Sequence, residues 1–417
     1  MRPFAAFHFG FRVPDFLRPS AFGFRVLCLI LLIQVGSLPA SAELINVSPY
    51  AQWKRGPSTD PGFFPLAVWL QSPANAERYR AAGFNTYVGL WRGPTEEQLA
   101  TLKKAGIHLI CEQNNAALRH LDDDTIIGWM HGDEPDNAQE LHDKSGYGPP
   151  VLPEKIVESF HRMHSADSSR PIMLNLGQGV AWDGWYGRGS RSNHPEDYPK
   201  YVEGCDIVSF DIYPVVHDNK RVIGRLDYVA RGVERLIQWT GGKKVVWNCL
   251  ECTHISNPDR KPTPAEVRSE AWMSIIYGTQ GLIYFVHQFK PTFREAGLLD
   301  DAEMLDAITS LNNQITQLAP VLHEPSVTGA VSMRLFRESD SLTTLVKRHD
   351  GVIYVFVVEM KGLATSAEFK INSSNAISIE VLGENRSILS EAGSFHDRFS
   401  PWDVHLYRVR NQPVYNK

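Results

Sequence analysis

Between residues 64 and 318 the chain repeats one unit eight times: a short apolar run, then a segment with helical periodicity, then a turn. The repeat is clearest near its start, where the apolar runs Phe84–Trp91 and Ile107–Cys111 each follow an Ala-Gly pair. Glycine in that place supplies the left-handed backbone that ends a helix. Strands that alternate with helices pair in parallel, and continuously apolar strands are buried on both faces. This repeat therefore predicts an α/β fold with a parallel sheet.

The number of units indicates how that sheet is closed. The predicted strands cover residues 64–70, 84–91, 107–111, 125–130, 171–176, 206–213, 244–250 and 281–286. Eight strands favour a closed (β/α)₈ barrel, the TIM barrel, over an open doubly wound sheet. Thr95 and Thr263 begin capping boxes, which mark the starts of two of the helices. No Gly-rich phosphate turn follows the first strand, so a dinucleotide-binding fold loses its main support.

The pattern changes after residue 323. Short β-rich runs separated by turn residues follow, at residues 327–335, 342–347, 352–358, 367–371, 377–382 and 404–409. This spacing predicts a small antiparallel β-sandwich over residues 324–417. Its expected role is to pack against the barrel, and sugar binding by it is left open.

The first 42 residues read as a secretory signal peptide. Four arginines precede an apolar run at residues 26–35, and the small residues Ala40-Ser41-Ala42 follow as a cleavage signal. The run is too short to span a bilayer comfortably, which argues against a membrane anchor. We therefore expect cleavage near Ala42, a secreted or periplasmic protein that has no membrane contact after cleavage, and a barrel over residues 43–323.

Composition excludes some partners. The net charge of −5 is well mixed, and no basic patch suggests a nucleic acid. The four cysteines beyond the signal peptide are Cys111, Cys205, Cys249 and Cys252. Cys249 and Cys252 lack the two further ligands that a zinc site needs, so we expect buried thiols or at most one disulfide. No sequence motif calls for a metal or a cofactor, and none is predicted.

The active site of such a barrel lies where strands end and the following loops begin. Two glutamates close apolar strands there: Glu134 after the fourth strand and Glu251 after the seventh. A lone carboxylate in that place would be costly, whereas a facing pair performs glycoside hydrolysis. One carboxylic acid protonates the leaving oxygen, and the other attacks the sugar or activates water. The sequence therefore predicts a glycoside hydrolase that acts on an oligo- or polysaccharide.

The segment Gly-Trp-Met-His-Gly-Asp-Glu-Pro-Asp, residues 128–136, resembles a motif of the clan A retaining glycoside hydrolases. The resemblance covers residues 64–318 as topology and only short stretches as motif. It implies Glu134 as acid/base, Glu251 as nucleophile, and Tyr213 as a hydrogen-bond partner of the nucleophile. Two positions depart from the clan. Asp133 replaces an Asn that contacts the sugar, and the eighth strand offers Phe285, His287 and Gln288 in place of a Trp.

Other polar and aromatic residues at strand ends or in the loops are candidates for substrate binding. They are Asp133, Tyr213, Trp69, Trp91, Asn175, Trp182, Trp185, Asp211 and His287. The pair Trp182 and Trp185 is the best placed, because it lies in a long, Gly-rich and polar loop at residues 178–195. For each Trp alone, ordinary packing is an equal alternative.

Two other functions stay open. In a non-catalytic glycan-binding barrel, the tryptophans would matter and both glutamates would be dispensable. A metal-dependent barrel hydrolase would need ligands at strand ends, and some are available: His131, Asp133, Asp211, His254 and His287. Glutamine substitutions of the glutamates separate the first alternative from hydrolysis, and sensitivity to a chelator would reveal the second.

Overall fold

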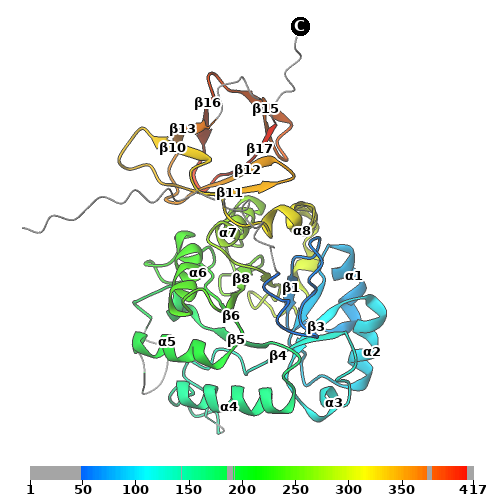
Figure 1. Cartoon of the computed structure of the whole chain (residues 1–417). Coiled ribbons are helices and arrows are strands. Elements are labelled where there is room, and N and C mark those ends of the chain that lie inside the picture. Colours follow the sequence, from blue (N-terminus) through cyan, green and yellow to red (C-terminus); the bar gives the residue numbers. More distant parts are fainter. Residues whose placement is uncertain (1–47, 142, 186–190, 192, 373–377, 411–417) are drawn as a thin grey trace, which may run out of the picture. The chain divides into compact units, whose positions relative to one another are not determined.

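The computed structural model describes residues 48–141, 143–185, 191, 193–372 and 378–410, so the predicted signal peptide lies outside the described residues. The first large element is a parallel sheet surrounded by helices (Figure 1). Its strands are β1 (Leu66–Trp69), β2 (Thr86–Val88), β3 (His108–Cys111), β4 (Ile126–Met130), β5 (Ile172–Leu176), β6 (Ile207–Phe210), β7 (Val245–Val246), β8 (Asn248–Glu251) and β9 (Leu282–Phe285). The helices are α1 (Ala76–Ala81), α2 (Glu96–Ala105), α3 (Asn115–Leu118), α4 (Pro153–Ala166), α5 (Tyr198–Tyr201), α6 (Asp227–Trp239), α7 (Pro264–Ile276) and α8 (Ala302–Leu322).

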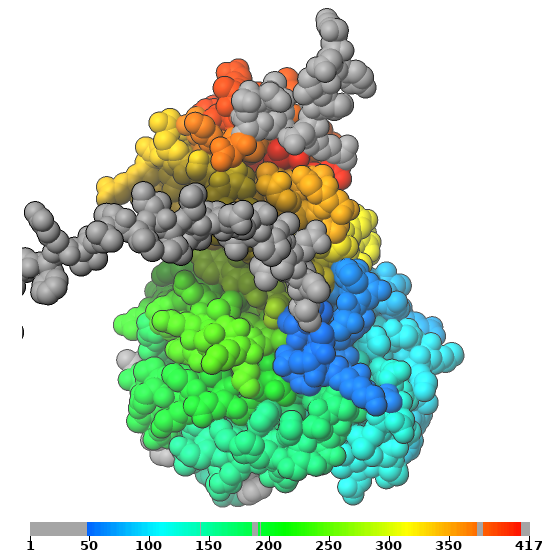
Figure 2. Space-filling model, in the orientation of Figure 1, coloured from blue at the N-terminus to red at the C-terminus, as the bar shows by residue number. Residues whose placement is uncertain are grey.

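The sheet closes on itself because β7 and β8 are two halves of one strand, separated only by Trp247. The hydrogen-bonded order is β7-β6-β5-β4-β3-β2-β1-β9-β8, so the circuit begins and ends on that strand. The predicted (β/α)₈ barrel is confirmed. On the face drawn in Figure 2, the surface colours around the barrel pass from blue through cyan to green, in the order of the sequence.

An apolar interior fills the barrel, and a residue ahead of β1 completes it. Tyr50 and Trp247 are both fully buried among inward-facing side chains such as Ile110, Ile207 and Ile283. The indole Nε1 of Trp247 donates to the Tyr50 hydroxyl at 2.9 Å, and that hydroxyl donates to the Gln280 carbonyl at 2.6 Å. The buried indole N–H of Trp247 and the hydroxyl of Tyr50 therefore both have hydrogen-bond partners.

The helix boundaries follow the predicted signals closely. Thr95 and Thr263 both form capping boxes, and Gly106 ends α2 with a φ of 67°. Helix α8 continues to Leu322, beyond the predicted end at Leu318, although Pro320 lies inside it. Buried Val321 explains the extension, because its side chain packs into the core after the proline. Proline removes one backbone N–H donor from the helix, and the buried side chains of Ala319 and Val321 on either side of it keep the last turn packed on the core.

The C-terminal part is an antiparallel sandwich of two sheets, as predicted. One sheet has the order β10-β13-β16 and the other β11-β12-β17-β14-β15. The strands are β10 (Val331–Leu335), β11 (Leu342–His349), β12 (Val352–Glu359), β13 (Thr365–Ile371), β14 (Ser378–Val381), β15 (Arg386–Leu389), β16 (Ser394–Phe399) and β17 (Val404–Arg410). The sequence pattern missed β15 and β16. In β16, Asp397 lies between the buried Phe395 and Phe399 and interrupts the apolar alternation, while Arg386 and Tyr407 bind its carboxylate.

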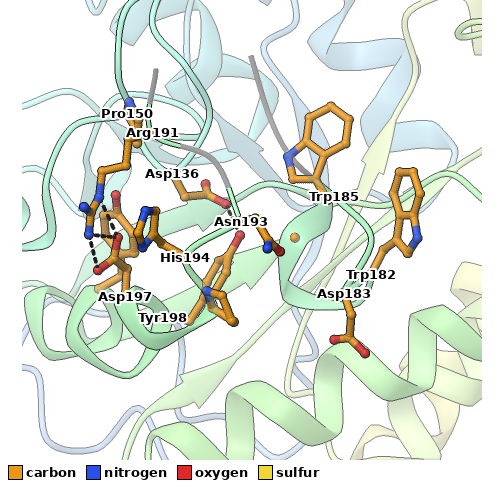
Figure 3. A pocket seen from close by; sticks show the side chains of 13 residues that line it. Asp136, Pro150, Trp182, Asp183, Trp185, Arg191, Asn193, His194, Asp197 and Tyr198 are labelled. Atoms are coloured by element: carbon orange, nitrogen blue, oxygen red, sulfur yellow. Dashed lines mark hydrogen bonds and ion pairs between the residues drawn. The ribbon is translucent and has the colours of Figure 1, made fainter. Parts of the chain in front are cut away.

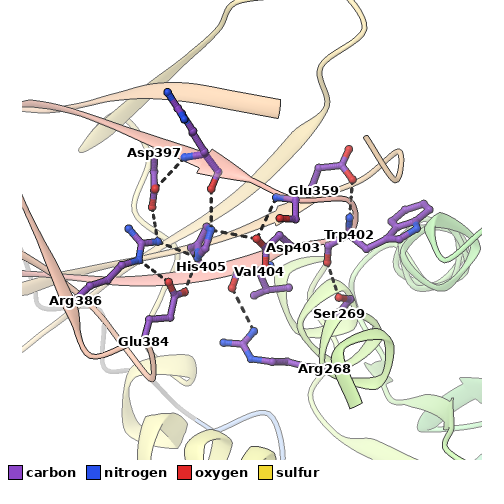
Figure 4. Close-up of polar contacts among 12 residues, drawn as sticks. Arg268, Ser269, Glu359, Glu384, Arg386, Asp397, Trp402, Asp403, Val404 and His405 are labelled. Carbon is purple, nitrogen blue, oxygen red and sulfur yellow. Dashed lines mark hydrogen bonds and ion pairs between the residues drawn. The ribbon is translucent and has the colours of Figure 1, made fainter. Parts of the chain in front are cut away.

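Barrel and sandwich share one apolar core. The ring of Trp272, on α7, stacks on Phe356 of β12 with ring centroids 5.4 Å apart and an interplanar angle of 12°. Beside this stack, Arg268 donates to the Val404 carbonyl at 3.3 Å and Ser269 bonds the Trp402 carbonyl (Figure 4). These contacts give the sandwich a packing role against the barrel.

Four cysteines are buried free thiols, which agrees with the expectation of buried thiols or at most one disulfide: Cys111, Cys205, Cys249 and Cys252. None of the helices in the described ranges has the length and apolar character needed to cross a membrane.

Candidate active site

Three neighbouring strands place acidic and amide side chains at one mouth of the barrel. Asp133 and Glu134 follow β4, Asn175 lies in β5, and Asp211 follows β6. Because the carboxyl ends of parallel strands meet at one edge, these residues come together as predicted. Asp133 is exposed, whereas Glu134 and Asp211 are half-buried, so the group is open to solvent.

Asn175 joins the acids of the two flanking strands. Its Nδ2 donates to Asp133 at 2.9 Å and to Asp211 at 3.4 Å. The Ser209 hydroxyl donates to its Oδ1 at 2.7 Å, which fixes the orientation of the amide. Asn175 therefore holds two carboxylates at a set separation while being itself buried.

Glu134 and Asp211 are in hydrogen-bonding contact through their carboxyl groups. Desolvation, and then the charges of Asp211 and Asp133, raise the pKa of Glu134 well above its ordinary value. Desolvation and the Asp133 charge raise the pKa of Asp211 to about 7. Two carboxylates in contact share one proton. Hydrogen bonds from the Tyr213 hydroxyl and the Asn175 amide favour the ionised form of Asp211, so Asp211 loses its proton first, as pH rises through about 7, while Glu134 keeps its own.

The backbone at Glu134 is strained. Its φ of 40° lies in the left-handed region, which costs energy for a residue with a side chain. Strain of this kind persists where the surroundings fix it. Here the side chain is fixed by Asp211 on one side and by Asn137 on the other, since the Asn137 amide also bonds the Glu134 carboxyl.

A pocket of about 250 Å³ lies beside the acids, between the loops after β4 and β5 (Figure 3). Asp136 lines it and accepts from the Gly177 backbone N–H and the Tyr198 hydroxyl, each at 2.9 Å. Burial raises the pKa of Asp136 to about 6. Trp182 and Trp185 also line the pocket, with ring centroids 5.9 Å apart. Part of the predicted loop 178–195, residues 186–190 and 192, lies outside the described residues.

The pocket is connected to Glu134 through Asn137. The Trp185 indole donates to the Asn137 Oδ1 at 3.0 Å, and the amide of the same side chain reaches Glu134. Sequence reasoning missed both Asp136 and Asn137 as site residues. The signal was present for Asp136, since it is the last residue of the 128–136 motif, whereas nothing in the pattern marked Asn137.

The structure does not bring Glu251 together with Glu134. The Glu251 side chain is fully buried, and its two carboxyl oxygens accept the backbone N–H groups of Val215 at 2.6 Å and Val216 at 3.0 Å. The charged groups that act on its pKa are Glu270 and Glu266, both from α7. Tyr213 correspondingly bonds Asp211 and not Glu251.

Aromatic side chains cover the mouth on the side of β9. Tyr213 lies against Phe285, with centroids 5.3 Å apart, and Phe285 continues to Phe289 at 6.0 Å. Phe289 and Phe293 are 46% and 62% exposed, an unusual exposure for such large rings. The buried His287 stacks on both, and burial lowers its pKa to about 4, so the ring is neutral. The sequence predicted His287 as a site residue but missed the two phenylalanines.

The remaining predicted tryptophans are divided between core and surface. Trp69 is 5% exposed and packs inside the barrel, whereas Trp91 is 67% exposed on the loop after β2. Of the residues named for a metal site, His131 is buried and bonds the Gly204 carbonyl. Within the ranges that the structure describes, no three His, Cys, Asp or Glu side chains gather so that they could hold a metal ion.

We predict that Asp211→Asn raises Tm more at pH 8 than at pH 5. The pKa of Asp211 is about 7 in the folded protein against an ordinary 3.8, so the unfolded chain loses this proton first as pH rises. Folding stability therefore falls across that window, and the loss is complete above pH 7. Asparagine has no proton to lose. Calorimetry of both proteins at the two pH values measures the difference, and an equal shift at both would contradict the assignment.

No protein-family model and no curated protein matches the sequence. Solved structures do share the fold. A GH27 β-L-arabinopyranosidase from Geobacillus stearothermophilus is 12% identical with a TM-score of 0.52, covering 88% of this chain and 99% of that chain. An α-amylase from Geobacillus thermoleovorans, complexed with acarbose, is 10% identical with a TM-score of 0.50, covering 84% and 98%. A putative α-galactosidase/melibiase from Bacteroides fragilis is also 10% identical with a TM-score of 0.50, covering 84% and 79%. At these identities the similarity shows the fold alone.

Proposed function

We propose that the protein is a glycoside hydrolase that cleaves O-glycosidic bonds of an oligo- or polysaccharide between Glu134 and Asp211. The observation that carries the proposal is the contact between these two carboxyls at the open barrel mouth, because two carboxylates in contact favour a shared proton. Glycoside hydrolysis needs one protonated and one ionised carboxyl beside the scissile bond. Enzymes of similar fold that act on sugars, among them an amylase with bound acarbose, lend further support.

The two carboxyls take different roles because their surroundings differ. Glu134 keeps the proton and donates it to the leaving oxygen as general acid. Asp211 is ionised, is held by Tyr213 and Asn175, and attacks the anomeric carbon or activates water. The resemblance implied Glu251 for this second role. We assign it to Asp211 because the Glu251 side chain is fully buried and both of its carboxyl oxygens are occupied by backbone N–H groups.

Retention of configuration is the proposed stereochemical outcome. Retaining enzymes hold their carboxyls about 5–5.5 Å apart, and inverting enzymes leave about 6.5–9.5 Å for a water molecule. Carboxyls in contact have no water-sized gap between them, so an entering sugar ring must separate them and would meet Asp211 directly. Proton NMR of the first product formed distinguishes the outcomes, because a retained anomer supports direct attack and an inverted one overturns it.

Two aromatic surfaces flank the acids and would bind the sugar rings. Trp182 and Trp185 line the pocket on one side, and Phe289 and Phe293 lie beyond Phe285 on the other. Aromatic faces offer large apolar contact with a defined geometry. Exposed Asp133 would accept hydrogen bonds from sugar hydroxyls but cannot donate one, unlike the Asn of the clan that the sequence resembles.

The proposal is tested with oligosaccharides and aryl glycosides of both anomers, by following released reducing ends and aglycone. Hydrolysis of any member supports it. Binding by calorimetry without any hydrolysis would favour the non-catalytic glycan-binding barrel. Hydrolysis that a chelator abolishes, and that added metal restores, would favour the metal-dependent hydrolase.

We predict that Gly177→Ala lowers kcat/KM by about 10²-fold, the size of effect expected when a reacting group is displaced by about 1 Å. A β-carbon at Gly177 would lie 2.9 Å from the Glu134 Oε1 and 2.9 Å from the Asn137 Nδ2, closer than such contacts allow. Gly146→Ala is the control, since no atom lies within 4 Å of its added β-carbon. The φ of 158° at Gly146 disfavours a side chain, so this variant also shows what backbone strain alone does to stability and activity. Unchanged kinetics in Gly177→Ala would separate Glu134 from the reaction.

We further propose that the enzyme acts outside the cytoplasm, on the strength of the arginines, apolar run and Ala40-Ser41-Ala42 signal of its first 42 residues. Mass spectrometry of the mature protein from its own host tests this. A mass that still includes those residues would overturn cleavage near Ala42.

A further inference from the structure

Two carboxyl groups meet in the interior between the end of β8 and helix α7. Glu251 ends β8 and Glu270 lies in the middle of α7, and both side chains are fully buried. Their carboxyls are in hydrogen-bonding contact. No Lys, Arg or His of the described ranges forms an ion pair with either one. A dry contact between two negative charges would be strongly unfavourable, so the pair needs a proton.

The surroundings of the two carboxyls decide which of them holds that proton. Glu251 accepts two backbone N–H groups, from Val215 and Val216, and this favours its ionised form. Among the described residues no donor bonds either oxygen of Glu270 with full hydrogen-bond geometry, and the backbone N–H of Glu251 has the smallest influence on its pKa. A carboxylate left without donors in the interior is costly, whereas a protonated carboxyl can donate its O–H to Glu251. Burial, and then the Glu251 charge, raise the pKa of Glu270 well above its ordinary value, in agreement with this assignment.

The groups bound by Glu251 belong to the segment that carries the reacting carboxylate. Val215 and Val216 follow directly after Asp211 and Tyr213, whose hydroxyl bonds Asp211. The far side of the segment is held by Ser256, whose hydroxyl donates to the Val216 carbonyl at 2.7 Å. Anchoring of the two N–H groups by Glu251 therefore sets the path of the chain from β6 past Tyr213.

We propose that protonated Glu270 and ionised Glu251 form a buried acid pair that positions the turn at residues 214–216, and through it Tyr213 and Asp211. Glu251 is then a positioning residue and not the reacting carboxylate. The shared proton is inferred from the contacts of Glu251 and Glu270 alone. The effect of the pair on catalysis rests on the proposed function.

The pair has a defined response to pH. Other titratable groups around it are Glu266 from the same helix, Cys252 after β8, and the ion pair of Lys261 with Asp301. Burial raises the pKa of Glu251 to about 8, above the ordinary value of 4.5 that holds in the unfolded chain. Carboxyls with raised pKa lose stability as pH rises toward the folded value. As pH rises through about 8, Glu251 therefore loses its proton and becomes the ionised member of the pair, while Glu270, whose pKa is raised further by the Glu251 charge, keeps its own.

The test compares Glu270→Gln with Glu251→Gln in the full chain, by Tm from pH 6 to pH 9. An amide at position 270 keeps a donor toward Glu251 and cannot ionise, so this variant should fold, keep its activity and lose part of the alkaline fall in Tm. Its infrared spectrum should lack the band of one buried protonated carboxyl. An amide at position 251 turns an N–H₂ toward backbone donors, so this variant should lose Tm at every pH. An alkaline slope in Glu270→Gln equal to that of the unchanged protein would overturn the shared proton.

A second variant separates positioning from direct reaction. If Glu251 were the nucleophile, Glu251→Ala would regain turnover when azide or formate is supplied as a small replacement anion. We expect no such rescue, and rescue of Glu251→Ala by azide would overturn the positioning role. Failure of the proposed function appears differently: the unchanged protein would hydrolyse no glycoside, while the Tm and infrared results for Glu270→Gln would still hold.

Discussion

Asp211→Asn is expected to lower kcat/KM by about 10³-fold or more, because an amide can neither attack the sugar nor activate water. The carboxyl of Asp211 touches the proton-bearing Glu134 and is held by Tyr213 and Asn175 at the barrel mouth. Asparagine nearly matches its shape, so the pocket should persist. Steady-state kinetics on the best substrate of the panel measures the loss, and calorimetry with an oligosaccharide should show nearly unchanged binding.

Asp227→Asn is the matched control for this variant. Asp227 begins α6 and pairs with Arg225 on the surface, remote from the acids, so kinetics should not change. Glu134→Gln should show a loss similar to that of Asp211→Asn, but smaller for substrates with a good leaving group, which need little protonation. Full activity in Asp211→Asn would remove Asp211 from the reaction and return the nucleophile to Glu251.

Trp272→Ala is expected to lower the free energy of unfolding by about 3–5 kcal/mol, as large aromatic truncations in cores do. Trp272 is fully buried and joins α7 to the sandwich through its stack on Phe356. Loss of the indole would leave a cavity between the barrel and the sandwich. Urea unfolding followed by circular dichroism measures the change, and calorimetry shows whether both parts still melt together.

Trp272→Phe serves as the control, since it keeps an aromatic face toward Phe356. It also removes an indole N–H that finds no hydrogen-bond partner in the described part of the chain, which offsets part of the lost packing. We expect this variant to lose clearly less stability than Trp272→Ala. A change below about 1 kcal/mol in Trp272→Ala would mean that the sandwich contributes little to the stability of the barrel.

The fold could be predicted because its signals are local. Capping boxes at Thr95 and Thr263 and the glycine at Gly106 each need only a few neighbouring residues, and the structure has all three. The eight apolar strands were also visible in the sequence. The pattern failed where a polar side chain takes an inward, half-buried position, as Asp397 does in β16, because only the distant Arg386 and Tyr407 make that position favourable.

The site was predictable in location but not in pairing. Strand ends named Glu134, Asn175 and Asp211, and the structure brings them together. Which carboxyls face each other depends on contacts between distant segments. Glu251 stands two and four residues after Cys249 and Trp247, which face the barrel interior, so alternation along the strand predicts that it also faces inward. Its carboxyl is instead bound by the backbone after β6 and by Glu270 on a helix. No spacing rule along the chain contains that information.

The bond from Tyr50 to Gln280 links positions 230 residues apart, and so has a consequence for how the barrel is made. A ribosome must deliver about two thirds of the chain before the first strand can meet the last. Until then the growing polypeptide displays unpaired strand edges, which invite association with other chains. Non-local closure of this kind also slows folding. Fragments that end before β9 should therefore accumulate as aggregates, and a chaperone that binds extended segments should matter most during synthesis of residues 66–285.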